Sequence, residues 1–263
     1  MIMFYFSGTG NSKYIARLFS QKMNAAHYSI EEDIDFAALI EANDVIGFCY
    51  PVYMSRVPRI MRNFVTKHMD KLKDKKLVIF CTQLLLSGDG ARAFAALFPP
   101  NHVDVIYAEH FFMPNNVCNF ALLRQTRDKG VYKRMKMAES KMERVCKNIK
   151  SGIVKKRGFS AVSRLSGKIQ GKPWQGDSRN SHAAEGTMEY RAKHGVKTDA
   201  DCTACVECCP MHNLENRQGK ISHKNNCTMC YRCVNLCPQK AITVFFHTKP
   251  EWQYKGVQKC NTK

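Results

Sequence analysis

Eight of the 13 cysteines in this 263-residue chain lie between Cys202 and Cys237. Thiolates at this density bind metals in a compartment that keeps thiols reduced. The chain begins Met-Ile-Met-Phe-Tyr-Phe, without the basic and small-residue pattern of a signal peptide, and no window holds eighteen consecutive apolar residues. We therefore expect a cytoplasmic, metal-binding protein without a membrane span.

The second half of the cysteine-rich stretch has a regular spacing. Its four cysteines are separated by two, two and three residues, and a proline follows: Cys227, Cys230, Cys233, Cys237 and Pro238. This run resembles the motif with which bacterial two-cluster ferredoxins bind iron–sulfur clusters. The resemblance implies that its first three cysteines and Cys209 hold one [4Fe-4S] cluster, and that Cys237 completes a second.

The first half of the stretch is compressed, because Cys208 and Cys209 are adjacent before Pro210. Two ligand sets compete, with either Cys208 or Asp199 as the remaining ligand. Both sets keep the same four cysteines: Cys202, Cys205, Cys209 and Cys237. We favour Cys208, since a thiolate is the softer and commoner ligand of iron–sulfur clusters. This second cluster is expected to be the less complete of the two, either labile or a [3Fe-4S] centre.

Zinc is the main alternative to iron and sulfide. The pairs Cys202-x2-Cys205 and Cys227-x2-Cys230 together are similar to a four-cysteine zinc pattern. A single zinc would use four thiolates and leave the other cysteines of the stretch unexplained, whereas the ferredoxin interpretation uses them all.

A second chemical signal lies at the N-terminus. The apolar run from Ile2 to Phe6 predicts a buried strand, and apolar residues at helical spacing follow from Ile15. Between them lie glycines and short polar side chains: Ser7, Gly8, Thr9, Gly10, Asn11 and Ser12. Such a loop at a helix N-terminus binds phosphate. It lacks the P-loop lysine and the third glycine of dinucleotide sites, and it resembles the flavin mononucleotide (FMN) phosphate loop of flavodoxins. An ordinary strand-to-helix turn is the alternative.

Further strands and helices alternate along the first 150 residues. Strands are predicted near 26–30, 45–49, 76–82 and 103–109, and helices near 36–42, 57–70, 89–98 and 122–150. This order predicts an α/β fold with a flavodoxin-like, doubly wound, five-stranded parallel sheet in the order 2-1-3-4-5. The loops after the third and fourth strands lie where flavodoxins hold the flavin ring, which implies contacts from Pro51, Val52, Tyr53, Thr82, Gln83 and Gly88.

Aromatic and imidazole side chains near these loops have two interpretations each. Tyr50 or Tyr53 could stack on the flavin ring or could be an aromatic residue at the edge of the core. His110 could donate a proton near the flavin, but a structural role is the commoner one for such a histidine. We assign no catalytic residue.

The net charge of +19 is concentrated in the middle of the chain, since residues 121–173 hold 16 Lys and Arg against three Asp and Glu. A solvated basic face is the default interpretation. A docking surface for an acidic redox partner is the functional alternative, and nucleic acid is disfavoured because aromatic residues are sparse there.

We predict a flavodoxin-like domain over 1–152, a basic linker over 153–195 and a small α+β two-cluster ferredoxin-like domain over 196–263.

Together, the phosphate loop and the cysteine runs resemble the flavodoxin–ferredoxin fusion proteins of anaerobic microbes. The resemblance implies electron transfer between two [4Fe-4S] clusters and FMN, with a ferredoxin, a flavodoxin or a reductase as partner. Two alternatives stay open. One is an FMN-dependent reductase of a small organic substrate, and the other is a redox or iron–sulfur sensor that binds nucleic acid through the basic segment.

Overall fold

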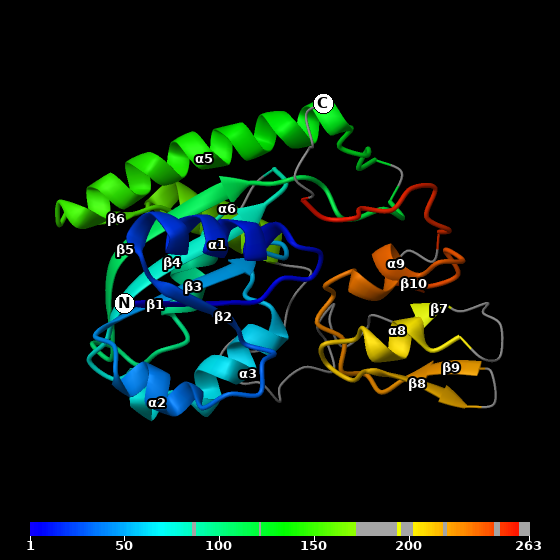
Figure 1. The fold of residues 1–263 in the computed structure, drawn as a ribbon, viewed down its shortest axis with the longest axis horizontal. Coiled ribbons are helices and arrows are strands. Elements are labelled where there is room, and N and C mark those ends of the chain that lie inside the picture. The colour runs from blue at the N-terminus through cyan, green and yellow to red at the C-terminus, as the bar shows by residue number, and fades with distance from the viewer. Residues whose placement is uncertain are drawn as a thin grey trace.

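A computed structural model describes residues 1–85, 88–120, 122–171, 194–195, 202–217, 220–244 and 248–257. Two units lie side by side in Figure 1: a layered α/β unit formed by the N-terminal part of the chain, and a smaller unit that contains the cysteine-rich stretch. Asp199, the alternative ligand of the second cluster, lies outside the described residues, as do residues 172–193 of the predicted linker.

The α/β unit is built on one parallel sheet with the strand order β2-β1-β3-β4-β5-β6. Its strands are β1 (Ile2–Tyr5), β2 (Ala26–Ser29), β3 (Val45–Pro51), β4 (Lys76–Gln83), β5 (Asp104–Phe112) and β6 (Lys155–Lys156). The first five confirm the predicted order, and β6 adds a short sixth strand that pairs with Tyr107 and Ala108 of β5. All four residues of β1 are buried, as the apolar run predicts for a central strand covered on both faces.

Helices cover both faces of this sheet. They are α1 (Asn11–Met23), α2 (Phe36–Glu41), α3 (Arg59–Lys67), α4 (Gly90–Ala95) and α5 (Asp128–Lys150), with a 3₁₀ turn at Asp70–Leu72. On one face, Phe19 of α1 and Met142 of α5 belong to the same buried cluster as Phe80 of β4. On the other, Phe36, Phe64 and Phe94 of α2, α3 and α4 pack with Phe4 and Phe48. The carboxyl ends of the strands point toward the smaller unit (Figure 1).

The segment predicted as a linker contributes to the α/β unit where it is described. After β6, helix α6 (Ala161–Gly171) lies against loops of the sheet. A Cβ on Gly167 would collide with the Asp89 carboxylate, and one on Gly171 would stand 2.9 Å from Nε of Arg56. Two glycines four residues apart therefore let α6 approach these loops closely.

The smaller unit consists of short elements around a cysteine-rich core. They are β7 (His194–Gly195), α8 (Ala204–Glu207), β8 (Leu214–Arg217), β9 (Lys220–His223), α9 (Arg232–Leu236) and β10 (Thr243–Val244). β8 pairs with β9 and β7 with β10, both antiparallel. Leu214, Ile221, Val234 and Ile242 are buried with the cysteines. In the described part of the chain, no helix combines the length and the apolar character that crossing a bilayer requires.

Candidate functional site

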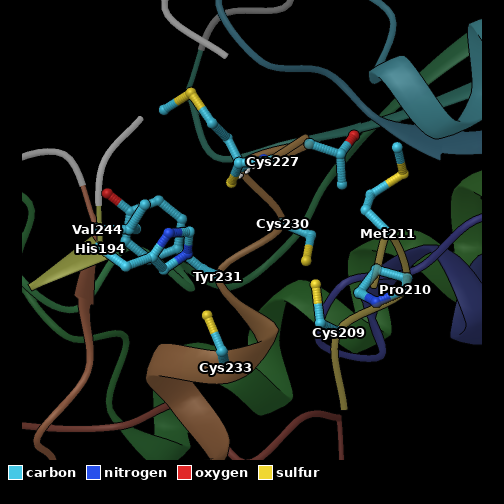
Figure 2. Close-up of a pocket in the computed structure, with 11 residues that line it drawn as sticks. His194, Cys209, Pro210, Met211, Cys227, Cys230, Tyr231, Cys233 and Val244 are labelled. Atoms are coloured by element: carbon cyan, nitrogen blue, oxygen red, sulfur yellow. Dashed lines mark hydrogen bonds between the residues drawn. The ribbon is translucent and has the colours of Figure 1, made fainter. Parts of the chain in front are cut away.

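Four cysteines line one pocket of the smaller unit. Their side chains point into a common space in Figure 2, and they come from both cysteine runs: Cys209, Cys227, Cys230 and Cys233. Met229 and Tyr231 have positive φ angles of 56° and 60°, so the backbone winds around the pocket before α9 begins. This grouping has the composition that the ferredoxin resemblance implies for the first cluster.

Backbone amides point at several of the sulfur atoms. Met229 N donates to Cys227 Sγ over 3.2 Å, and Asn213 N donates to Cys209 Sγ over 3.3 Å. Ala241 N donates to Cys237 Sγ over 3.3 Å. N–H donors of this kind stabilise thiolates and tune the potential of an iron–sulfur cluster. The donor set therefore suits thiolate ligation at both cysteine runs.

The other cysteines form a less regular group. Burial, with smaller contributions from the neighbouring Cys237 and Cys202 thiols, raises the pKa of the Cys205 thiol to about 11. Burial also raises the pKa of Cys208 to about 12, and the thiols that contribute there are Cys230, Cys209 and Cys205. Cys208 thus lies near thiols of both cysteine runs, with its Sγ 3.6 Å from the carbonyl oxygen of Cys205.

The thiols of the cysteine-rich unit line the walls of open space and do not meet around a single point. Within the described ranges, no group of three His, Cys, Asp or Glu side chains could hold a single metal ion. The pocket in Figure 2 is lined on its other sides by Pro210, Met211, Tyr231 and Val244.

The predicted phosphate loop joins β1 to α1. Gly10, at φ 97°, is the N-cap of α1, and its N–H donates to Ser7 Oγ over 3.1 Å. Ser12 Oγ and Thr82 Oγ1 are 2.8 Å apart in the interior, so the loop is tied to the end of β4. Asn116 Nδ2 donates to Thr9 Oγ1 over 3.1 Å. The first N–H groups of a 13-residue helix have no partner within the helix, so this loop fits a phosphate.

The residues predicted to surround the flavin ring meet at the carboxyl ends of β3 and β4. Val52 N donates to Thr82 O over 3.0 Å, which joins the two loops. Gln83 Nε2 donates to Leu85 O over 3.4 Å, and Gly88, at φ 50°, lies against Gly167 of α6. The structure therefore brings together two of the loops that the sequence placed at this edge, and it adds α6 beside them.

Two aromatic candidates and one histidine have different environments. Tyr50 is fully buried, donates to Gly90 O over 3.1 Å and stacks on Phe94, so it is a core residue. Tyr53, two residues after Pro51, is half-buried and packs against the core of the smaller unit. His110 is buried in the sheet, which fits the structural interpretation.

Sequence reasoning missed the residues that join the two units. Arg232, between two cysteines of the second run, donates to Gly8 O over 3.1 Å and to Ser7 O over 2.8 Å. It also donates to Cys208 O over 3.3 Å and forms an ion pair of 2.6 Å with Glu31. Nothing in the local pattern marks this arginine, because its partners Ser7, Gly8 and Glu31 lie more than 200 residues earlier in the chain.

A second set of contacts comes from the C-terminal segment. Tyr254 O–H donates to Asn11 Oδ1 over 2.7 Å, and Tyr254 N–H donates to Asn235 Oδ1 over 2.6 Å. Asn235 Nδ2 donates to Asn116 O over 2.8 Å. The phosphate loop, α9 and the C-terminal segment therefore form one hydrogen-bonded network.

Comparison with known proteins identifies both units. The family model described as Flavodoxin domain matches residues 2–152, and the model described as 4Fe-4S binding domain matches residues 221–243. A ferredoxin from Methanothermococcus thermolithotrophicus is 41% identical over 46 residues, which are 17% of this chain and 77% of that protein.

Solved flavodoxins are similar to the α/β unit. The two-electron reduced flavodoxin of Megasphaera elsdenii is 20% identical, with a TM-score of 0.37, and the match covers 54% of this chain and 99% of that one. Oxidised flavodoxin 2 of Bacillus cereus is 16% identical, with a TM-score of 0.34 and coverage of 54% and 97%. On the family models, the chain belongs to the flavodoxin domain family and carries a ferredoxin-type 4Fe-4S binding domain after it.

Proposed function

We propose that this protein transfers electrons between FMN in its flavodoxin domain and two [4Fe-4S] clusters in its ferredoxin-type domain. The presence of both domains supports a redox electron-transfer role. One observation carries the finer proposal: Arg232 of the second cysteine run donates directly to two carbonyl oxygens of the phosphate loop. The site for one cofactor is therefore built against the site for the other.

The loop Ser7–Ser12 would hold the FMN phosphate at the N-terminus of α1, and Pro51–Tyr53, Thr82–Gln83 and Gly88 would lie beside the ring. FMN supplies one- and two-electron redox chemistry when it is bound. The chain's own part is to position the ring and to exclude water from it. Tyr53 contributes to both, because it packs against the cysteine-rich core while its loop lies at the flavin edge.

The first cluster would be held by the four cysteines of the pocket in Figure 2: Cys209, Cys227, Cys230 and Cys233. Cys202, Cys205 and Cys237 would hold the second cluster, and Cys208 remains our choice for its fourth ligand. Cys208 lies near Cys230 as well as near Cys205, so the second site would be the less complete one, holding a labile cluster or a [3Fe-4S] centre. The first cluster is then the one adjacent to FMN.

The exposure of the proposed cluster ligands predicts sensitivity to oxygen, which would suit a place in anaerobic metabolism. Cys202, Cys208 and Cys209 are half-buried, so solvent reaches ligands of both proposed clusters. Exposed thiolates are the first to be oxidised.

The partner would be another redox protein, such as a ferredoxin, a flavodoxin or a reductase. The sequence suggested that an acidic partner docks on the basic segment. In the structure, Lys155 and Arg157 of that segment pair with the buried Glu109, at 3.1 and 3.3 Å. A test of docking should therefore neutralise Lys156 and Lys133, which do not contact this carboxylate.

Anaerobic purification followed by iron, acid-labile sulfide and FMN counts per chain tests the proposal. We expect about one FMN, together with iron and sulfide for two clusters. Reduction of the clusters, followed by electron paramagnetic resonance and flavin absorbance, should show electrons reaching FMN. Zinc without acid-labile sulfide, or clusters that never exchange electrons with bound FMN, would refute it.

A further inference from the structure

A groove on the flavodoxin domain lies away from the cysteines, between α5, β5 and β6. Its volume is about 940 Å³, which is large enough for a small molecule. Six cationic side chains line it: Lys136, Lys141, Arg144, Lys147, Lys155 and Arg157. Among its described lining residues, Glu109 is the one carboxylate. Figure 1 shows α5 and β6 on the far side of the sheet from much of the smaller unit.

The carboxylate at the base of the groove fixes three of the cations. The Glu109 side chain is only 2% exposed, and it pairs with Lys141 at 3.0 Å, Lys155 at 3.1 Å and Arg157 at 3.3 Å. One negative charge cannot neutralise three positive ones. Each ammonium has three N–H donors and each guanidinium has five, so donors remain for an anion in the groove.

Two further cations face the same space from α5. Arg144 and Lys147 are three residues apart, so they lie on adjacent positions of one helix face. Among the described residues, neither has an ion-pair partner. Lys136, the sixth cation, pairs with Glu139 at 3.3 Å. The other five cations exceed the single Glu109 carboxylate by four charges, which favours a ligand with several negative charges.

The groove also exposes apolar side chains. Phe112 is 38% exposed and Met137 is 52% exposed, and both line the groove. A flat ring could bury this apolar surface while the phosphates attached to it bind the cations.

We propose that this groove binds a nucleotide with two or more phosphates. The phosphates bind Arg144, Lys147 and the three cations that Glu109 positions. The base packs on Phe112 and Met137. A polypeptide rich in carboxylates has the charge but lacks the flat ring that the apolar surface favours. The site is separate from the FMN loop and does not depend on the proposed electron transfer.

Isothermal titration of the full-length protein with ADP and with inorganic pyrophosphate, at low ionic strength, tests the proposal. The double variant R144Q/K147Q should bind both probes about tenfold or more weakly. The matched control K129Q/K133Q removes the same charge from α5 outside the groove lining and should bind as the unaltered protein does. Phe112→Ser should weaken ADP binding and leave pyrophosphate binding unchanged.

Three results would overturn the proposal. One is no saturable binding of either probe to correctly folded protein. Another is equal weakening in both double variants, which would show an effect of net charge alone. The third is a poly-glutamate peptide that binds more tightly than ADP and displaces it, which would make the groove a protein-docking surface.

Discussion

Cys230 packs directly against Gly8, so a cysteine of the cluster motif touches the glycine of the phosphate loop. A Cβ on Gly8 would stand 3.0 Å from the Cβ of Cys230 and closer still to its carbonyl oxygen. The sequence separates these residues by more than 220 positions. The contact therefore links the two cofactor sites at the level of the backbone, where no side-chain rotation can relieve a clash.

Gly8→Ala should separate the two domains at this contact. We expect it to cost about 1–3 kcal/mol, since overpacking against backbone cannot relax, and to reduce the FMN retained after gel filtration. Gly130→Ala is the matched control, because that residue lies in α5 and a Cβ there meets only the Thr126 methyl group, at 3.1 Å. Equal FMN content in both variants would contradict the role of this contact.

Arg232→Gln should loosen the ferredoxin-type domain from the phosphate loop. The change removes the ion pair with Glu31 and at least part of the hydrogen bonding to Ser7 and Gly8. We expect faster limited proteolysis between the domains and slower electron transfer from reduced clusters to FMN. Arg217→Gln removes an exposed pair with Glu215 and should change neither rate. Unchanged proteolysis in Arg232→Gln would argue against a joining role.

Serine substitutions should distinguish the two adjacent cysteines. Cys209→Ser removes a proposed ligand that lines the pocket in Figure 2, and we expect it to abolish the signal of the first cluster in electron paramagnetic resonance. Cys208→Ser should leave that signal and affect the second cluster. Cys146→Ser, in α5, controls for thiol loss in general. Loss of the first signal in Cys208→Ser alone would reverse our ligand assignment.

His110 should make stability depend on pH. Burial, with smaller contributions from Arg157 and Lys141 and against the opposing effect of Glu109, lowers the pKa of His110 from 6.5 to about 4. The unfolded chain therefore binds a proton between pH 6.5 and 4 that the native protein does not, so stability falls as pH falls through this range. From pH 7 to pH 5 we expect a loss on the order of 2 kcal/mol.

Urea unfolding at pH 7 and pH 5 measures this loss. His27 and His68 also have lowered pKa values through burial, so the comparison must be with the variant His110→Gln, which keeps both. Burial raises the pKa of Glu109, but the hydrogen bond from His110 N–H and the ammonium groups of Lys141 and Lys155 hold it below its ordinary value. Glu109 therefore stays ionised between pH 7 and pH 5. The variant should lose less stability between the two pH values, and an equal loss would exclude His110 as the cause.

Local patterns in the sequence predict much of this protein. The apolar run of β1, the glycine loop before α1 and the spacing of Cys227, Cys230 and Cys233 each depend on residues close together in the chain. The same is true of the strand order, because alternating strands and helices restrict a parallel sheet to few topologies. The site loops follow from that order.

What the sequence could not predict depends on distant contacts. Arg232 finds Glu31 and Gly8 only when two domains pack together, and no spacing rule connects them. Helix α6 was missed because its three apolar residues at helical spacing, Val162, Leu165 and Ile169, are exposed and stand among glycines and basic residues that indicate a linker. Its contact with the sheet comes from glycines, which periodicity of apolar residues does not detect.

The hydrogen bond from Tyr254 to Asn11 joins residues 243 positions apart. On the ribosome, the phosphate loop is made among the first residues, whereas Tyr254 is made after both cysteine runs. The loop therefore completes its network only after the ferredoxin-type domain has been synthesised and has folded onto it. We therefore expect the proposed FMN site to be completed late in assembly, when the cysteines are already in place.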